Sequence, residues 1–343
     1  MNERYRVGIV GAGFGITAHL PALLAHPRFD VVALASPHRA AEIAPQRGIA
    51  HAFTDCDAML RGCDLDAVVV ASPPFAHHDD TLAVLAAGKH VLCEKPFALN
   101  VAQAEAMLAA GHAAGTACAV SHEFRWVPQR IALQQMAENG HLAPMRGIEL
   151  TYLRHGRRSI DHAPRGWHFT RATGGGMCGA ILSHAIDSTN YLVGRAPMRS
   201  TGYLRTAVPI RTDAQGTFPS ETDDGAFALL DYGDGLVARL SVDATTNAES
   251  FTLAVHGETR TAVASGNDLV PLRLFAVEDE TTDELEVKPS PYARLSSINE
   301  SVPMLMELYD AWIEQIETGK SSIPTFEEAV ATQRVLADIG YSI

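Results

Sequence analysis

Residues 7–16 read VGIVGAGFGI, an apolar run that ends in a cluster of glycines. The Val and Ile run predicts a buried strand, and residues 18–26 then show the apolar spacing of a helix. In such a strand–turn–helix, Gly11 permits the tight turn and Gly13 lets the backbone approach a pyrophosphate, which the helix N-terminus holds with its free N–H groups. The residues that we expect to bind a dinucleotide here are Gly11, Gly13, Phe14 and Gly15.

The match to the dinucleotide fingerprint is incomplete, because Ile16 stands where the third glycine is expected. That glycine ordinarily lets the helix lie close to the sheet. Gly15, one place earlier, can relieve this crowding. The alternative interpretation is a glycine-rich turn in another kind of α/β protein, but its place between a strand and a helix favours dinucleotide binding.

Apolar strands alternate with helices as far as about residue 120. Their continuous apolar runs are typical of a parallel sheet covered on both faces, so we expect a doubly wound α/β domain of the Rossmann type over residues 1–122. Expected strands lie at 7–10, 31–35, 67–71, 90–93 and 117–121, and expected helices at 18–26, 40–46, 58–60, 79–87 and 101–114.

The pattern changes after Arg125. Short strands with turn signals, including Gly-Asp-Gly at 233–235, predict an α+β domain with an antiparallel sheet over residues 123–343. Expected helices lie at 126–138, 177–192, 304–316 and 326–339, and expected strands at 145–153, 226–232, 236–242, 251–255, 262–264, 272–275 and 285–287.

Composition agrees with two domains and excludes several classes of function. A chain of 343 residues is too long for one ordinary core. The net charge of −13, without a basic run, argues against nucleic acid and anionic membrane surfaces as partners. Five scattered cysteines without a CxxC motif support neither a disulfide framework nor a metal site, and we expect reduced thiols in a cytoplasmic protein.

The end of the second expected strand bears on the choice of cofactor. Ser36 stands where an acid would bind the ribose diol of NAD, so no carboxylate repels a 2′-phosphate. Ser36 can donate a hydrogen bond and Arg39 can add positive charge. We therefore expect NADP, with NAD as the alternative if Arg39 is only a solvated residue of the next helix.

Several strings of this chain are informative together. The specific one is AGKHVLCEKP at 87–96. The others are Gly11-Ala12-Gly13 with His19, Ser72-Pro73-Pro74 with His77, Phe124-Arg125-Trp126-Val127-Pro128, Gly174-Gly175-Gly176 and Ser183-His184-Ala185-Ile186-Asp187. Together they resemble the glucose–fructose oxidoreductase/inositol dehydrogenase (Gfo/Idh/MocA) family. The likeness covers the first domain and about residues 123–194.

The resemblance implies a Rossmann domain followed by a domain with a large, mostly antiparallel open sheet. It also implies an NAD(P)-dependent enzyme that oxidises or reduces a sugar, a polyol or a derivative, and a homodimer or homotetramer that pairs through that sheet. The cofactor residues that it adds are Ser72, Pro73, His77, Glu94 and Lys95, and the expected substrate residues are Arg125, Trp167 and His184.

Lys95 and His184 are the expected catalytic residues. Lys95 lies just beyond the carboxyl end of a parallel strand, where open α/β sheets bind ligands. His184 lies on a helix, and the family often has an Asp four residues before it, whereas this chain has Ala180. Asp187, three residues after His184, is expected to be structural.

Three points stay open at this stage. The basic segment 154–173 is either a substrate loop for an acidic group or a solvated loop anchored by its aromatic residues. Ala180 and Ile16 are compatible with a retired enzyme that senses a dinucleotide. A third possibility is an enzyme that keeps its cofactor bound and uses transient oxidation.

Overall fold

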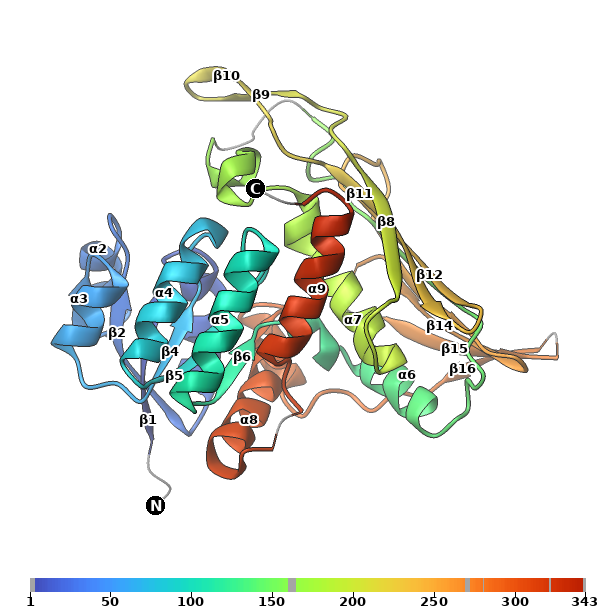
Figure 1. Ribbon diagram of the computed structural model, residues 1–343, viewed down its shortest axis with the longest axis horizontal. Helices are drawn as coiled ribbons and strands as arrows, with labels where there is room; N and C mark the ends of the chain where they lie inside the picture. The colour runs from blue at the N-terminus through green and yellow to red at the C-terminus, as the bar shows by residue number, and fades with distance from the viewer. Residues whose placement is uncertain (1–3, 160–164, 269–271, 280, 321, 342–343) are drawn as a thin grey trace. The chain divides into compact units, whose positions relative to one another are not determined.

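The computed structural model describes residues 4–159, 165–268, 272–279, 281–320 and 322–341 (Figure 1). The chain forms two compact units, Met1–Glu123 with Ser290–Val330, and Phe124–Pro289 with Ala331–Ile343. The segment Ser290–Val330 therefore belongs with the first unit, although the sequence pattern alone groups it with the second. No helix within the described ranges is long and apolar enough to cross a bilayer.

A parallel sheet of six strands forms the centre of the first unit, in the order β3-β2-β1-β4-β5-β6. The strands are β1 (Tyr5–Val10), β2 (Phe29–Ala35), β3 (His51–Phe53), β4 (Ala67–Val70), β5 (His90–Cys93) and β6 (Cys118–Val120). Five of them are the predicted strands. The edge strand β3 was not predicted, because its three residues contain no apolar run and two of them are exposed.

Helices follow most strands of this unit. They are the π-helical turn η1 (Gly15–His19), α1 (Leu20–Ala25), α2 (Ala40–Gln46), α3 (Cys56–Gly62), α4 (Pro74–Ala86), α5 (Val101–Ala114), the short η6 (Ala293–Ser297), α8 (Val302–Thr318) and the start of α9 (Phe326–Asp338). Helix α4 begins at Pro74, earlier than predicted, because proline is well tolerated at the first helical position.

Helix α8 belongs to the first unit because its apolar face packs against the start of the chain. Trp312 is fully buried, and its ring lies 6.0 Å from that of Phe29 on β2. All four residues of β4 are buried as well, as expected for a strand covered on both faces. The packed sheet fixes the carboxyl ends of β1, β4 and β5 as neighbours.

The second unit contains an eight-stranded mixed sheet, in the order β16-β15-β14-β13-β7-β12-β11-β8. Only β7 and β12 run parallel to each other, and all other pairs are antiparallel. The strands are β7 (Gly147–Leu153), β8 (Arg199–Arg205), β11 (Gly225–Gly233), β12 (Leu236–Asp243), β13 (Ser250–His256), β14 (Arg260–Gly266), β15 (Arg273–Glu278) and β16 (Thr281–Leu285).

One face of this sheet is buried and the other is not. Along β7, Ile148, Leu150 and Tyr152 are buried, and the residues between them are only half-buried. Figure 1 shows the helices α6 (Pro128–Glu138) and α7 (Ser183–Val193) on one side of the sheet only. The other face is open, as in the fold that the resemblance implied.

Three parts of the second unit differ from the sequence prediction. The expected strand at 285–287 is wrong, because the chain pairs over Thr281–Leu285 instead. The edge strand β8 and the separate hairpin of β9 (Ile210–Asp213) and β10 (Gly216–Pro219) were not predicted. Polar residues dominate these segments, so hydrophobic patterning gives no signal there.

Candidate active site

The glycine turn after β1 has the geometry that a pyrophosphate site requires. Gly11 has a φ of +110°, and a Cβ at this position would lie 2.1 Å from the carbonyl oxygen of Ala71. A Cβ on Gly13, in contrast, would meet no atom within 4 Å, and Gly13 is exposed. Phe14, the next residue, is half-buried, with its ring edge-to-face on His19. The turn therefore leaves open backbone at the N-terminus of η1, which fits a dinucleotide phosphate.

Gly15 performs the packing function of the missing third glycine. A Cβ on Gly15 would lie 2.9 Å from Cγ2 of Ile9 and 3.3 Å from Cβ of Ala71. The helix can therefore lie against the sheet at Gly15, and the Ile16 side chain is buried without blocking this approach. The amide of Leu20 bonds to the carbonyl of Gly15, five residues back, which makes this first turn π-helical.

Arg39 and Ser36 lie where the adenosine ribose is expected. Ser36 follows β2 directly and is half-buried, and its amide donates to the carbonyl of Phe53. Arg39 precedes α2, and its Nη1 donates to the carbonyl oxygen of Ala12, at 2.9 Å. The guanidinium therefore lies beside the glycine turn, although its side chain starts from the end of the neighbouring strand.

Ser72, Pro73 and His77 form the turn between β4 and α4. The Ser72 hydroxyl donates to Oδ2 of Asp80, at 2.7 Å, and Pro73 lies just before the first turn of α4. The buried His77 ring lies between two carbonyl oxygens, with Nε2 2.7 Å from that of Ser72 and Nδ1 2.9 Å from that of Pro96. Burial lowers the pKa of His77, against the opposing effects of these carbonyls and Glu94. His77 thus joins the turn after β4 to the segment that carries Lys95.

Glu94 and Lys95 follow β5 at the same edge of the sheet. The Lys95–Pro96 peptide is cis, and Lys95 is half-buried. Oε2 of Glu94 accepts the Lys95 backbone N–H at 3.2 Å, and Oε1 lies 2.8 Å from Nε2 of His19. Burial favours the neutral carboxyl, but the His19 and Lys95 contacts outweigh it and lower the pKa of Glu94 to about 2. Glu94 is therefore an ionised, buried carboxylate next to Lys95.

The sequence interpretation missed two functional candidates here, His19 and Tyr309. His19 matched the family pattern but was given no role. Its Nδ1 lies 2.7 Å from the hydroxyl of Tyr309 on α8, and both side chains are fully buried. The two residues are 290 positions apart in sequence. No local pattern reveals such a contact.

His184 lies in the second unit, at the start of α7. The preceding segment η5 (Cys178–Leu182) is π-helical, with the Ser183 amide bonded to the carbonyl of Cys178. Such π turns are frequent at functional sites. The His184 ring is buried and stacks on Phe124, with centroids 3.9 Å apart and planes inclined by 16°. Ala180 lies half-buried in the π turn.

Arg125 was predicted to contact substrate, but its guanidinium makes a buried bidentate ion pair with Asp187. Nε donates to Oδ2 at 2.8 Å and Nη2 to Oδ1 at 2.5 Å, and the guanidinium also lies over the ring of Tyr191. This contact ties the segment before α6 to α7, one turn after His184. The geometry therefore favours a structural function for both Arg125 and Asp187.

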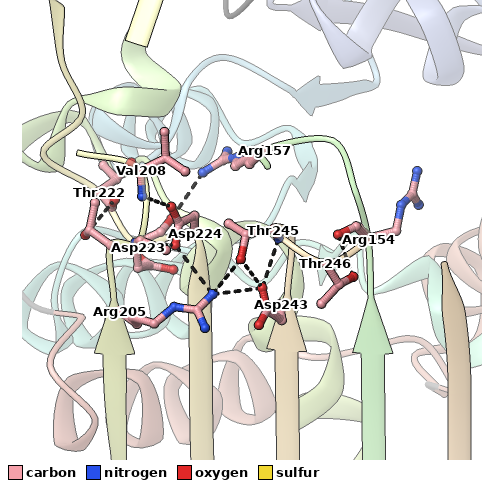
Figure 2. Close-up of polar contacts among 12 residues, drawn as sticks. Arg154, Arg157, Arg205, Val208, Thr222, Asp223, Asp224, Asp243, Thr245 and Thr246 are labelled. Atoms are coloured by element: carbon pink, nitrogen blue, oxygen red, sulfur yellow. Dashed lines mark hydrogen bonds and ion pairs between the residues drawn. The ribbon is translucent and has the colours of Figure 1, made fainter. Parts of the chain in front are cut away.

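The arginines of the basic segment 154–173 are mostly engaged within the second unit. Arg154 pairs with Asp268, Arg165 with Asp213, and Arg171 donates to the carbonyl of Gly340. Arg157 donates to the carbonyl of Asp223, and burial lowers its pKa (Figure 2). Trp167 is half-buried, and the centroid of its ring lies 3.7 Å from that of the His168 ring. These contacts favour the anchored loop over a loop that recognises an acidic substrate.

Asp223 and Asp224 form a second polar cluster that the sequence interpretation did not find (Figure 2). Asp223 accepts the Cys178 N–H at 2.7 Å, which caps the π turn before His184. A Cβ on Gly176 would lie 2.2 Å from this carboxylate, so the glycine makes room for it. Burial raises the pKa of Asp223 to about 6. Asp224 pairs instead with the buried Arg211, at 3.4 Å.

In the described ranges, no group of three or more His, Cys, Asp or Glu side chains is arranged to hold a metal ion.

Comparison with known proteins identifies the family. A model described as the Gfo/Idh/MocA oxidoreductase family, NAD-binding Rossmann fold, matches residues 5–122, and the model of the C-terminal domain of the same family matches residues 131–263. Levoglucosan dehydrogenase of Pseudarthrobacter phenanthrenivorans is 30% identical over 74% of this chain and 72% of its own length. An NADP(+)-dependent scyllo-inositol 2-dehydrogenase of Bacillus subtilis is 24% identical over 97% of this chain and 92% of its own.

Solved structures show the same fold over nearly the whole chain. Levoglucosan dehydrogenase in complex with NADH and levoglucosan has a TM-score of 0.86 and 22% identity, covering 98% of this chain and 96% of the other. An oxidoreductase domain protein of Kribbella flavida gives the same TM-score and coverage at 24% identity. The sequence and family matches, together with this fold, show that the chain belongs to the Gfo/Idh/MocA family of oxidoreductases, with a Rossmann NAD(P)-binding domain and the C-terminal domain of that family.

Proposed function

We propose that this protein is an NADP(H)-dependent dehydrogenase or reductase that acts on a CH–OH group of a sugar, a polyol or a derivative of one. The observation that carries the proposal is the position of Lys95. It follows β5 at the carboxyl edge of the parallel sheet, two strands from the glycine turn that follows β1. Ligands of open α/β sheets bind at this edge. The buried, ionised Glu94 beside Lys95 distinguishes this lysine from a solvated surface residue.

The relatives support the class of substrate. The names of the relatives include a levoglucosan dehydrogenase, a 1,5-anhydro-D-fructose reductase and a scyllo-inositol 2-dehydrogenase, all of which act on sugars or cyclic polyols. These molecules are small, neutral and rich in hydroxyl groups. A site for them needs hydrogen-bond donors rather than a cluster of arginines, which agrees with the contacts that engage Arg154, Arg157, Arg165 and Arg171 within the second unit.

We assign separate roles to Lys95 and His184. A bound nicotinamide would supply or accept the hydride. The Lys95 ammonium would donate a hydrogen bond to the reacting oxygen and stabilise the charge that develops on it. His184 would take the hydroxyl proton during oxidation and return it during reduction. Its stacking on Phe124 would hold the ring in one orientation.

The preference for NADP(H) rests on Ser36 and Arg39. A phosphate on the ribose carries negative charge, and a guanidinium binds phosphate oxygens with charge-assisted hydrogen bonds. Arg39 already lies beside the glycine turn through its contact with Ala12. Gly11, Gly13, Phe14 and Gly15 would hold the pyrophosphate side of the cofactor, and Ser72, Pro73 and His77 would form the neighbouring wall.

The test is an assay of a sugar and polyol panel, including levoglucosan and scyllo-inositol, with NADP(+) and NAD(+) and with product analysis. Net reduction of the nicotinamide with at least one substrate, lost in Lys95→Met, would support the proposal. Tight NADPH binding without any turnover would favour a dinucleotide sensor. Conversion of a substrate without net change in the nicotinamide, by protein that retains its cofactor through purification, would favour transient oxidation.

A further inference from the structure

Three side chains from distant parts of the first unit form a buried chain of hydrogen bonds that ends at Lys95. The Tyr309 hydroxyl lies 2.7 Å from Nδ1 of His19, and Nε2 of His19 lies 2.8 Å from Oε1 of Glu94. The other carboxylate oxygen, Oε2, accepts the backbone N–H of Lys95. The members come from α8, η1 and the end of β5, so three separate elements converge on one carboxylate.

This chain of contacts lies almost entirely out of reach of water. Tyr309 and His19 are fully buried and Glu94 is 5% exposed, so the carboxylate has lost almost all contact with water. Burial disfavours the charged form of a carboxyl, and the contacts with His19 and Lys95 compensate for the lost water. The protein contacts, and not solvent, therefore set the orientation of this carboxylate.

The hydrogen-bond roles along the chain are consistent with an ionised Glu94. Since a carboxylate only accepts, Nε2 of His19 must donate to it, and Nδ1 then faces a hydroxyl that can either donate or accept. Burial and the negative charge of Glu94 both raise the pKa of Tyr309 well above its ordinary value, so its hydroxyl keeps its proton. Each polar atom of the chain thus has a defined partner.

We propose that Tyr309 and His19 are positioning residues for Lys95. They hold the Glu94 carboxylate in one orientation, and the carboxylate fixes the Lys95 backbone and attracts its ammonium group. The proposal rests on the proposed function, in which Lys95 acts on the reacting oxygen. Neither Tyr309 nor His19 needs to touch substrate or cofactor for this effect.

The central variant is Tyr309→Phe, which removes one hydroxyl and keeps the ring in the core. We expect kcat to fall roughly tenfold, because a buried network loses one of its bonds, while KM and the NADPH dissociation constant change by less than about twofold. The matched control is Tyr292→Phe. Tyr292 also bonds through its hydroxyl to the same helix, at Asp310, and among the described residues no direct contact connects it to Glu94. Its kcat should equal that of the wild type.

His19 provides a rescue test. His19→Ala should lower kcat more than Tyr309→Phe, because Glu94 loses the N–H donor that contacts it directly. His19→Gln restores an N–H donor near the position of Nε2 and should recover part of the loss. If His19→Ala does not fold, the comparison of Tyr309→Phe, His19→Gln and Tyr292→Phe still decides the proposal.

A second measurement needs no substrate. The chain has four lysines, so reductive methylation with 13C-formaldehyde gives few lysine signals, and Lys95→Arg assigns that of Lys95. Tyr309→Phe should move the Lys95 signal and Tyr292→Phe should not. If wild-type protein turns over no sugar or polyol but the signal moves, the proposed function fails and the positioning chain stands. An unmoved Lys95 signal with unchanged kcat in Tyr309→Phe would overturn the positioning chain alone.

Discussion

Nη1 of Arg39 donates a hydrogen bond to the carbonyl oxygen of Ala12, so a guanidinium from the end of β2 is fixed beside the glycine turn that follows β1. This contact gives the first prediction. Arg39→Ala should weaken NADPH binding by roughly 1.5–3 kcal/mol, the usual contribution of a charge-assisted hydrogen bond, and NADH binding much less. Fluorescence titration of both reduced cofactors measures the difference. Arg47→Ala, at the other end of α2, is the control and should change neither affinity. Tighter binding of NADH than of NADPH by the wild type would contradict the NADP preference.

The second prediction concerns Lys95 and His184. Lys95→Met should lower kcat by about 10²–10⁴-fold with little change in KM, because the lost interaction acts mainly in the transition state. His184→Ala should lower kcat less, since water can partly replace a proton carrier. Both variants should still bind NADPH, because neither residue holds the pyrophosphate.

Lys89→Met, in the turn before β5, is the control for the loss of a lysine. Steady-state kinetics on a confirmed substrate provide the comparison. Near-normal turnover of Lys95→Met would exclude the mechanism, and the sensor and transient-oxidation alternatives would then become stronger.

Most of the fold could be predicted from sequence, because the strands of the first unit are continuous apolar runs and the helices of both units have regular apolar spacing. The limits of that approach are equally physical. The edge strand β3 and the hairpin β9–β10 lack apolar patterning, and α8 joins the first unit through Trp312 and Tyr309, whose partners lie near the start of the chain.

The same distinction holds for the candidate site. The sequence alone could predict Gly11, Gly15 and Lys95 as site residues. Local features define them, namely the backbone geometry of a tight turn or the position directly after a strand. The pairing of Arg125 with Asp187 and of His19 with Glu94 depends on residues 62 and 75 positions apart, so sequence patterning could not reveal either contact. Arg125 therefore looked available for substrate although it is engaged in a buried ion pair.

The third prediction is that the protein forms a homodimer or homotetramer through the open sheet face. Tyr203 on β8 is 65% exposed and Leu229 on β11 is 44% exposed. Their two strands are neighbours in the sheet. Exposed apolar residues that gather on one face mark interaction sites. Leu229→Asp should shift the mass from light scattering toward that of one chain. Leu24→Asp, which replaces an equally apolar exposed residue of the first unit, should leave the mass unchanged. A monomeric wild type at micromolar concentration would contradict the prediction.

The fourth prediction concerns stability against acid near the active site. The Glu94 carboxyl has a pKa of about 2 in the folded protein, below its ordinary value of 4.5. A lowered pKa contributes stability above the ordinary value, and this contribution is lost as the pH falls through that range. Glu94→Gln should therefore flatten the acid side of the stability curve between about pH 4.5 and 2, measured by urea unfolding. An unchanged acid transition would show that folding does not lower the pKa of Glu94.

The last prediction contrasts two adjacent carboxyl groups, Asp223 and Asp224. Burial raises the pKa of Asp223 to about 6 from 3.8. Between these values the folded protein binds the proton more tightly than the unfolded chain does, so the free energy of unfolding decreases as the pH rises through this window. Asp223→Asn removes the titration and keeps an oxygen to accept the Cys178 N–H. It should therefore raise the free energy of unfolding at neutral pH by roughly 2–3 kcal/mol.

Asp224→Asn is the matched control and should have the opposite effect. Asp224 accepts the backbone N–H groups of Ala207 and Val208 and pairs with Arg211, which is as deeply buried as Asp224 itself. An amide cannot accept at both ends, and it leaves the buried guanidinium without its counter-charge, which costs about 3–5 kcal/mol. Urea unfolding of both variants from acid to neutral pH measures the two effects. Equal destabilisation by the two substitutions at neutral pH would show that the Asp223 carboxylate stabilises the fold and that burial does not raise its pKa.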